Sequence, residues 1–254
     1  MSWASRRRFI ILSIVGIVAV AFFIVLSLTV FYKAPSCSDG IQNQSEAGID
    51  CGGSCPYLCS DQANAPIVLF TKTISQNNGR TDVVVFVENA NASTAAKDVP
   101  YTLSLYGADQ VLVQEITGSI DLPPSSTVPI FIPNIASGSQ KVASAFLSIA
   151  PSAPKWFTLT VDPRIVPIVS NTTLGGSVSS PRINAVLSNT SVTPITNIDV
   201  IVVVHDEQGE VIAASRTIVP FLPSQGQAIA TFTWNSPFIR VPAKIEVIPV
   251  ISLP

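Results

Sequence analysis

Four cysteines are the residues in this 254-residue chain whose type and spacing point most directly to chemistry. They lie close together, at Cys37, Cys51, Cys55 and Cys59. An even number of clustered cysteines in an oxidising compartment predicts two disulfides, and the sequence leaves all three connectivities open. Cys51, Cys55 and Cys59 also have nearly the spacing of zinc ligands, so a thiolate zinc site is the alternative.

Oxygen-bearing side chains lie between these cysteines, at Asp39, Asn43, Glu46 and Asp50, and no basic residue occurs from residue 34 to residue 71. Calcium takes about six to eight oxygen ligands, so the four side chains could converge on it, although their spacing is not that of an EF-hand. Alternatively, they form turns and caps by hydrogen-bonding their own backbone. Calcium is therefore a hypothesis, and no other cofactor is predicted.

Residues with catalytic potential are sparse in the rest of the chain. The single histidine, His205, is followed by Asp206, but the pair ends an apolar run and leads into a turn, which indicates an exposed turn histidine. The sequence has no Gly-x-Ser-x-Gly elbow, no His-Glu-x-x-His pair and no phosphate-binding glycine loop. We therefore predict that the protein is not an enzyme and has no catalytic residues. An envelope hydrolase with a dispersed active site is the remaining alternative.

An apolar stretch near the N-terminus predicts how the chain is positioned. Residues 9–32 carry no charge, and a helix of that length spans a bilayer core of about 30 Å. Three arginines at residues 6–8 precede the stretch and only Lys33 follows it, so the positive-inside rule places the N-terminus in the cytoplasm. We expect a single-pass plasma-membrane protein with a cytoplasmic tail at residues 1–8. A long cleaved signal peptide is the alternative.

The composition agrees with export. Only 12% of the residues are charged and 47% are hydrophobic, whereas soluble domains have about 25% charged residues. All 16 acidic residues follow the apolar stretch, while four of the 14 basic residues precede it or lie directly beside it. The exported part is therefore mildly acidic, and nucleic-acid binding is not expected because no basic surface would neutralise phosphates.

The cysteine segment carries a family resemblance. From Cys37 to Cys55 the sequence reads C-x-D-G-x-x-N-x-x-E-x-x-x-D-C-G-G-x-C. This string resembles a Cys-rich motif of bacterial cell-surface proteins, where it lies near an anchor or between adhesive modules. The resemblance implies a surface location and a disulfide-stapled juxtamembrane module at residues 33–64. The spacing from Cys55 to Cys59 varies among such motifs.

From residue 65 onward the sequence predicts β-strands. Runs rich in Val, Ile, Thr and Phe are bounded by Gly, Pro, Asn and Ser, which is typical of all-β sandwiches. The predicted strands are 67–74, 82–88, 101–106, 111–117, 127–132, 142–149 and 156–161, followed by 164–170, 182–188, 198–205, 210–217, 228–233 and 244–250.

The two sets of runs align on each other with an offset of 100 to 101 residues. Two tandem β-sandwich domains at residues 65–162 and 163–254 explain this, although a shared strand rhythm would also produce it. The matched residues are Asn89 with Asn189, Asp98 with Asp199, Leu122-Pro123 with Leu222-Pro223, and Asn134 with Asn235.

The strand at residues 83–91 is similar to those of water-stress and late-embryogenesis-abundant β-sandwich domains, many of which are membrane-anchored. Fibronectin type III-like or immunoglobulin-like sandwiches fit as well, and all of these imply binding or structural modules. We therefore expect a cell-surface binding or scaffolding protein anchored by residues 9–32, with proteins or cell-envelope components as partners. A calcium-responsive surface module is the alternative function.

Overall fold

The computed structural model describes residues 3–31, 36–76, 79–135 and 140–254. The chain divides into two compact units, Met1–Cys55 and Pro56–Pro254. Each unit is described by itself below.

The first unit begins with one long apolar helix. Helix α1 (Trp3–Phe31) contains a stretch, Ser5–Thr29, that is long and apolar enough to cross a membrane and has no buried part. Its apolar side chains surround the helix instead of forming one stripe, which is typical of a membrane span. A signal sequence near an N-terminus has the same properties. The predicted span ends with Tyr32, which, like Lys33, lies outside the described residues.

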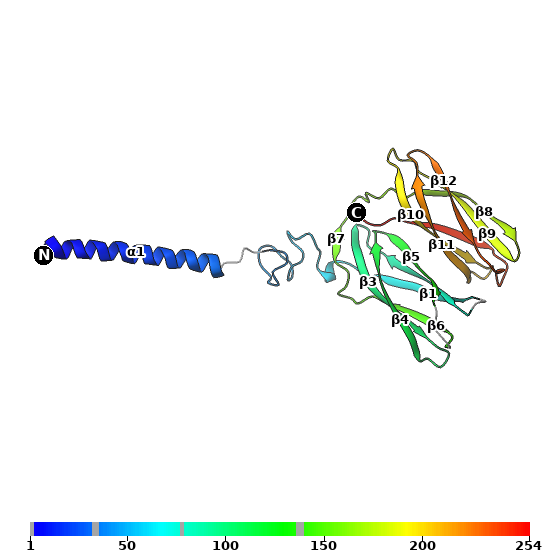
Figure 1. The fold of residues 1–254 in the computed structure, drawn as a ribbon, viewed down its shortest axis with the longest axis horizontal. Helices are drawn as coiled ribbons and strands as arrows, with labels where there is room; N and C mark the ends of the chain where they lie inside the picture. The colour runs from blue at the N-terminus through cyan, green and yellow to red at the C-terminus, as the bar shows by residue number, and fades with distance from the viewer. Residues whose placement is uncertain (1–2, 32–35, 77–78, 136–139) are drawn as a thin grey trace. The chain divides into compact units, whose positions relative to one another are not determined.

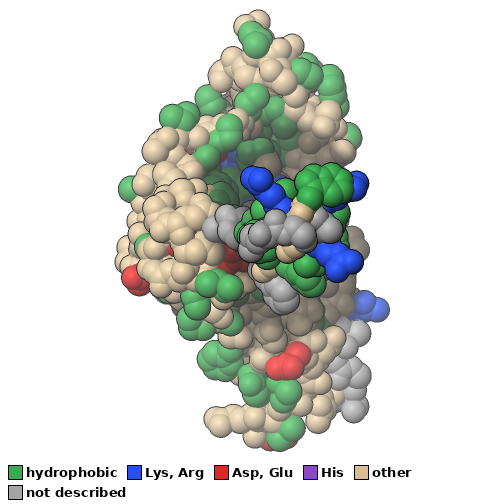
Figure 2. Space-filling model, turned by 90° about the vertical axis from the view of Figure 1, so that its left-hand side faces the viewer, with side chains coloured by type: hydrophobic (Ala, Val, Ile, Leu, Met, Phe, Trp, Pro, Cys, Tyr) green, Lys and Arg blue, Asp and Glu red, His purple; other side chains and the backbone are tan. Residues whose placement is uncertain are grey.

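The basic residues gather at the N-terminal end of α1. Figure 2 looks onto this end, and blue Lys and Arg side chains lie there around green hydrophobic ones. The guanidinium carbon of Arg7 lies 5.5 Å from the centroid of the Trp3 ring. A cation above an indole ring is attracted by the ring face, and tryptophan is enriched at membrane–water interfaces.

The cysteine module that follows has little regular structure and is held by disulfides. Cys37 bonds to Cys55, with their Cα atoms 5.6 Å apart. Cys51 and Cys59 are disulfide-bonded as well, and the described part of the chain has no free cysteine. The predicted disulfides are thus confirmed, and thiolates for a zinc site are not available.

One glycine of the cysteine motif, Gly53, is needed because a side chain at its position would clash. Gly53 adopts φ +59°, and a Cβ atom at this position would lie 1.6 Å from the backbone oxygen of Ser45. A side chain there would clash with backbone, which cannot move aside without opening the turn.

The second unit is all-β and contains two sandwiches, as the sequence predicts (Figure 1). The 3-10 helix η1 (Ser60–Gln62) precedes them. The first sandwich comprises β1 (Ile67–Ser75), β2 (Thr81–Asn89), β3 (Thr94–Tyr106), β4 (Leu112–Leu122), β5 (Ser126–Ile135), β6 (Ser144–Ser148) and β7 (Trp156–Thr158). The second sandwich comprises β8 (Ile168–Ser177), β9 (Ser180–Ser188), β10 (Ile195–His205), β11 (Val211–Leu222), β12 (Gln227–Thr233) and β13 (Lys244–Val250).

The strand order of the second sandwich repeats that of the first. The first sandwich pairs a β1-β2-β5 sheet with a β4-β3-β6 sheet, and β7 also pairs with β3. The second pairs a β8-β9-β12 sheet with a β11-β10-β13 sheet, so each strand from β1 to β6 has a counterpart from β8 to β13. All of these pairings are antiparallel.

Several strands differ from the predicted ranges. The strands β4 and β11 continue to Leu122 and Leu222, β7 ends at Thr158, and β8 begins at Ile168. Local reasons explain two further differences. β3 begins well before residue 101, because the polar pair Lys97-Asp98 lies inside it at an irregularity where Asp98 has φ 51°. β8 continues beyond residue 170, because Gly175 and Gly176 pair with β9. The predicted boundary at residues 162/163 divides the two sandwiches, which belong to one compact unit.

Three apolar cores hold the second unit together. One lies inside the first sandwich around Leu103, Leu122 and Trp156, and another lies inside the second around Ile183 and Phe232. The third core lies between the sandwiches and combines side chains from β2, β5, β10 and β11. This shared core consists of Val84, Phe86, Phe131, Ile201, Val203, Val211 and Ala214.

The shared core explains two uninterrupted apolar runs in the sequence. Along β2, Val83, Val85 and Val87 face the first core while Val84 and Phe86 face the shared core. The run at residues 200–204 of β10 divides in the same way between the second core and the shared core. Strands buried on both faces need apolar residues at every position, whereas strands with one open face alternate.

Candidate functional site

The four predicted calcium ligands lie in the first unit and form hydrogen bonds with the backbone of their own loop. The Asp50 carboxylate accepts hydrogen bonds from the backbone N–H groups of Asp39 and Gly40, at 3.0 and 2.9 Å. Glu46 Oε2 accepts from the backbone N–H groups of Asn43 and Asp50, each at 3.3 Å. These contacts are the turn and capping contacts of the alternative interpretation.

Asp39 completes this loop. Its carboxylate accepts hydrogen bonds from the Asn43 side-chain amide, at 2.8 Å, and from the backbone N–H of Ile41, at 2.9 Å. Asn43 Oδ1 is buried and has no hydrogen-bond partner among the described residues. The hydrogen bonds link the four residues into one loop, while the convergence of their oxygens on calcium stays a prediction.

One acidic side chain of the loop contacts the disulfide. Glu46 is buried, and its Oε1 lies 3.2 Å from Cys55 Sγ. Ligand atoms of Cys37, Glu46 and Cys55 lie within 4.8 Å of one another. Because the two sulfurs are bonded to each other, this cluster has no thiolate to offer a metal.

His205 and Asp206 lie at the turn between β10 and β11, as predicted, but they are not exposed. Only 12% of the His205 side chain is accessible, and its Nε2 lies 3.4 Å from Glu246 Oε2. Asp206 Oδ1 accepts hydrogen bonds from the backbone N–H groups of Gln208 and Glu210, at 3.0 and 2.9 Å. The pair therefore organises a turn, and both residues are covered because an arginine and a neighbouring strand close over them.

That arginine is Arg240, whose Nη1 donates to Asp206 Oδ2 at 2.6 Å. Its hydrogen bond, with those of the turn amides, holds the pKa of Asp206 below its usual value. At the same turn, Lys72 of β1 donates to Glu210 and lowers the pKa of that carboxyl, which ties the two sandwiches together. No nucleophile faces His205 among the contacts of the described residues.

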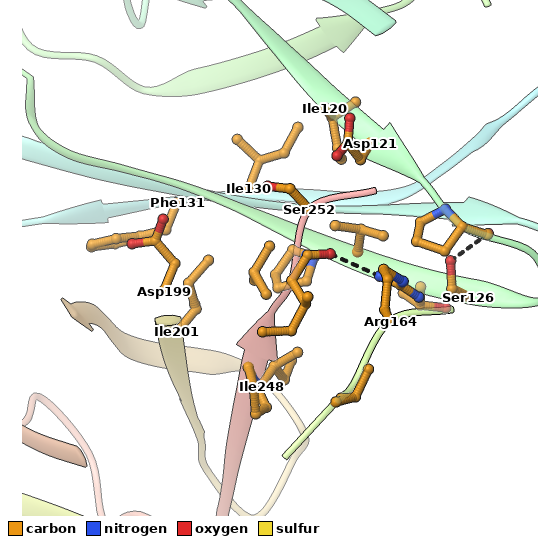
Figure 3. A pocket seen from close by; sticks show the side chains of 18 of the residues that line it. Ile120, Asp121, Ser126, Ile130, Phe131, Arg164, Asp199, Ile201, Ile248 and Ser252 are labelled. Atoms are coloured by element: carbon orange, nitrogen blue, oxygen red, sulfur yellow. Dashed lines mark hydrogen bonds between the residues drawn. The ribbon is translucent and has the colours of Figure 1, made fainter. Parts of the chain in front are cut away.

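A groove along the seam between the two sandwiches is the candidate binding site (Figure 3). It encloses a cavity of about 410 Å³. Its apolar floor includes Phe131, Ile201 and Ile248, while Asp121, Arg164 and Asp199 lie among its polar groups (Figure 3). Such a mixed lining suits a polar ligand or a peptide segment more than a purely apolar one.

Two of these polar groups fasten the C-terminal segment to the rest of the unit. Asp121 accepts hydrogen bonds from the backbone N–H groups of Asp98, at 2.8 Å, and Leu253, at 2.7 Å. Arg164 Nη1 donates to the Ile251 carbonyl at 2.9 Å, while the same guanidinium binds Asp162. That bond lowers the pKa of Asp162.

The remaining polar groups of the groove are less engaged. Asp199 Oδ1 lies 3.9 Å from Arg216 Nε and has no hydrogen-bond partner among the described residues. Burial raises the pKa of the nearby Tyr101 phenol. Figure 3 shows Asp199 and Arg164 on opposite sides of the C-terminal strand, so they do not form a catalytic pair. The groove can bind a ligand by hydrogen bonds, but its geometry offers no general base beside a nucleophile.

Sequence reasoning did not identify Asp121 and Arg164 as groove residues. It used Asp199 only as a marker of the repeat. A signal was present, because aspartate is depleted inside strands and an Asp there needs a partner. Asp121 and Asp199 both lie within strands, in β4 and β10.

Comparisons with known proteins leave the family open. No protein-family model matches the chain, and no curated protein matches it. Among solved structures it is similar to a crystal structure of red sea bream transglutaminase, with 12% sequence identity and a TM-score of 0.24. The similarity covers 74% of this chain and 29% of the transglutaminase chain. A likeness at that level carries no argument about fold or activity.

Proposed function

We propose that the protein is anchored in the plasma membrane by α1 and presents its β-sandwiches at the cell surface, where they bind or scaffold proteins or other envelope components. The observation that carries the proposal is that an apolar helix is followed by a module whose cysteines are all disulfide-bonded. Structural disulfides persist in oxidising compartments, which lie outside the cytoplasm. The arginines at residues 6–8 favour a cytoplasmic N-terminus.

A scaffold is favoured over an enzyme by the way the second unit is built. The shared core, the Lys72–Glu210 contact and the Asp121–Leu253 hydrogen bond all join the two sandwiches. Two polar groups of the seam groove, Asp121 and Arg164, bond to backbone. A pair of sandwiches fastened in this way suits the presentation of surfaces at a fixed geometry.

We infer further that the two sandwiches are copies of one unit. Strand order supports this, and so do two buried asparagines at matched positions. The amide nitrogens of Asn89 and Asn189 each donate to a backbone carbonyl at or just before the start of the third strand, and to one in the Leu-Pro turn after the fourth. The immunoglobulin-like or fibronectin-like assignment stays a prediction.

Labelling of introduced cysteines tests the topology. Because the native cysteines are all in disulfides, Thr117→Cys and Ser5→Cys each add a single thiol. A membrane-impermeant maleimide added to intact cells should label the Thr117→Cys protein, and should reach Ser5→Cys only after permeabilisation. Labelling in the opposite pattern would contradict the proposed orientation. A mature protein whose mass lacks α1 would show a cleaved signal peptide instead.

Hydrolase assays of the full chain test the proposal that the protein is a scaffold and not an enzyme. We expect no turnover of ester, peptide or glycoside substrates. Turnover that disappears in an Asp199→Asn variant would contradict the proposal, because it would place a catalytic group in the seam groove.

A calcium-responsive module is a second candidate function, favoured by the buried and unpartnered Oδ1 of Asn43, whose amide nitrogen donates to Asp39. Calorimetry of the oxidised full chain with calcium tests it, with Asp50→Asn as the variant. Binding that Asp50→Asn weakens would support a calcium site. Absence of heat at millimolar calcium would leave these carboxylates only their backbone contacts.

A further inference from the structure

The two sandwiches differ in how the free edge of their first strand is protected against pairing with another strand. An uncovered sheet edge presents unpaired backbone N–H and C=O groups, and proteins guard such edges with charged residues, proline or neighbouring elements. Most described edge strands carry such guards or are short. The guarding residues are Lys72 in β1, Glu115 and Asp121 in β4, Pro129 and Pro133 in β5, Arg216 and Pro220 in β11, and Lys244, Glu246 and Pro249 in β13.

β8 has no such guard. Its ten residues include no charged residue and no proline, and every residue from 171 to 177 is exposed. β12 is also uncharged, but it is shorter and several of its residues are buried or half-buried. An irregularity between Ser170 and Thr173 interrupts β8, so residues 173–177 form its regular edge.

β1, the counterpart of β8, shows what covers this position in the first sandwich. Lys72 lies opposite Val84 and is paired with Glu210 of the second sandwich. Beside it, Thr73 Oγ1 donates to the carbonyl of Ala143 at 3.3 Å, which links β1 to the segment that leads into β6. This edge is therefore both charged and covered.

In the second sandwich the corresponding position is open and apolar. Thr173 lies opposite Asn184, so by register it takes the place of Lys72. Between the end of β8 and residues 238–242, the segment that leads into β13, lies a cavity of about 470 Å³. Val178, Ile239 and Val241 beside it are 87%, 74% and 75% exposed.

We propose that two copies of the chain associate edge to edge through β8, so that their β12-β9-β8 sheets join into one continuous sheet. In a two-fold contact of this kind each strand lies antiparallel to its own copy, and a charge on it would face like charge. The strand β8 meets this condition because it is uncharged. Of the cations beside it, Arg240 is neutralised by Asp206, and Arg182, opposite Gly175 on β9, donates to Asn184 of its own strand. The joined sheet would also cover the exposed apolar side chains that flank the β8 edge.

Disulfide trapping in native membranes tests the contact with the full chain. A Thr172→Cys variant adds one exposed thiol directly before the regular edge at residues 173–177, and mild oxidation should convert most of it to a species of twice the chain mass. Thr117→Cys is the matched control, since it places the thiol on β4, an edge strand guarded by Glu115. We expect little dimer from this control at the same expression level.

A charge on the edge should prevent the association. Adding Thr173→Lys to the Thr172→Cys variant should lower the trapped dimer by about fivefold or more, because two lysines would approach each other across the contact. Thr173→Val keeps the edge uncharged and should leave the yield unchanged, and thermal melts of both variants check that the fold is intact. Equal trapping of Thr172→Cys and Thr117→Cys would overturn the proposal. A Thr172→Cys adduct of any other mass would overturn it too, since the edge would then take a strand of a different protein.

Discussion

The two sandwiches have the same strand order but different surroundings, and their sequences differ where the surroundings differ. In the first, Val84 of β2 pairs with Phe131 of β5, and both are buried in the shared core. At the same register in the second, Asn184 of β9 pairs with Thr231 of β12 on a face that remains partly open. The repeated topology is therefore compatible with different outer faces, and burial decides which face must be apolar.

The β11-β10-β13 and β4-β3-β6 sheets show the same contrast, but here the buried face belongs to the second sandwich. Val203 of β10 pairs with Ala214 of β11, and both lie in the shared core. In the first sandwich the corresponding pair is Ser104 of β3 with Glu115 of β4, whose side chains are hydrogen-bonded at 3.1 Å. These matched pairs are thus more polar on the outward faces than between the sandwiches, where both partners are buried.

The largest expected effect comes from placing a charge in the shared core. Val203→Asp should lower the free energy of unfolding by more than about 3 kcal/mol, because the carboxylate would be buried without a partner. Ser104→Lys places a charge at the matched open position, opposite Glu115, and should lower it by less than about 0.5 kcal/mol. Denaturant titration of the full chain, followed by tryptophan fluorescence, measures both. Similar losses for the two variants would contradict the contrast between the faces.

A smaller effect is expected from the two buried asparagines, which test the similarity of the sandwiches. Asn89 donates to the carbonyls of Thr94, Leu122 and Pro123, and Asn189 to those of Thr193 and Pro223. Replacing either residue by alanine leaves buried carbonyls unpaired, at a cost of about 1–3 kcal/mol.

We expect Asn89→Ala to destabilise the protein more than Asn189→Ala does, because it leaves more carbonyls unpaired. The same denaturant titration measures the two variants side by side. A loss in only one of them would mean that the two corners are alike in geometry but not in energy.

The smallest effect on stability is expected at the turn between β10 and β11, the third and fourth strands of the second sandwich. In the second sandwich Arg240 lowers the pKa of Asp206, so the contact stabilises the fold above the ordinary aspartate pKa of about 3.9 and this contribution is lost as the pH falls through the lowered pKa. Arg240→Met should therefore destabilise the protein at pH 7, and the difference from wild type should shrink in strong acid. Unfolding titrations at several pH values between about 2 and 7 check this. A difference that does not depend on pH would contradict the role of the ion pair.

Much of this fold follows from the sequence, because strand composition, turn residues and the matched asparagines are local signals. The disulfides also follow from four clustered cysteines beside an apolar helix. The shared core was harder to predict, although the unbroken apolar runs at residues 83–87 and 200–204 indicate strands buried on both faces. Gly175 and Gly176 pair with β9 at the end of a hairpin, where glycine is favoured, so composition alone does not assign them to a strand.

The seam groove could not be predicted, since its groups come from distant segments. Asp121 contacts the backbone of Leu253, 132 residues further along the chain, and Arg164 contacts that of Ile251, 87 residues further along. Such contacts depend on how the two sandwiches pack, which no local pattern encodes. The hydrogen bonds of the acidic loop near the cysteines are easier to predict, because they join residues of one short segment.

Hydrogen exchange of a shared-core variant tests the central claim, that the two sandwiches depend on one core between them. Val203→Ala removes two methyl groups from β10 without adding a polar atom. Exchange of the full chain, read by mass spectrometry, should become faster in β10 and also in β2 at residues 83–87, which belong to the other sandwich. Faster exchange in the second sandwich alone, with β2 unchanged, would contradict the account and show that the two sandwiches are independently stable.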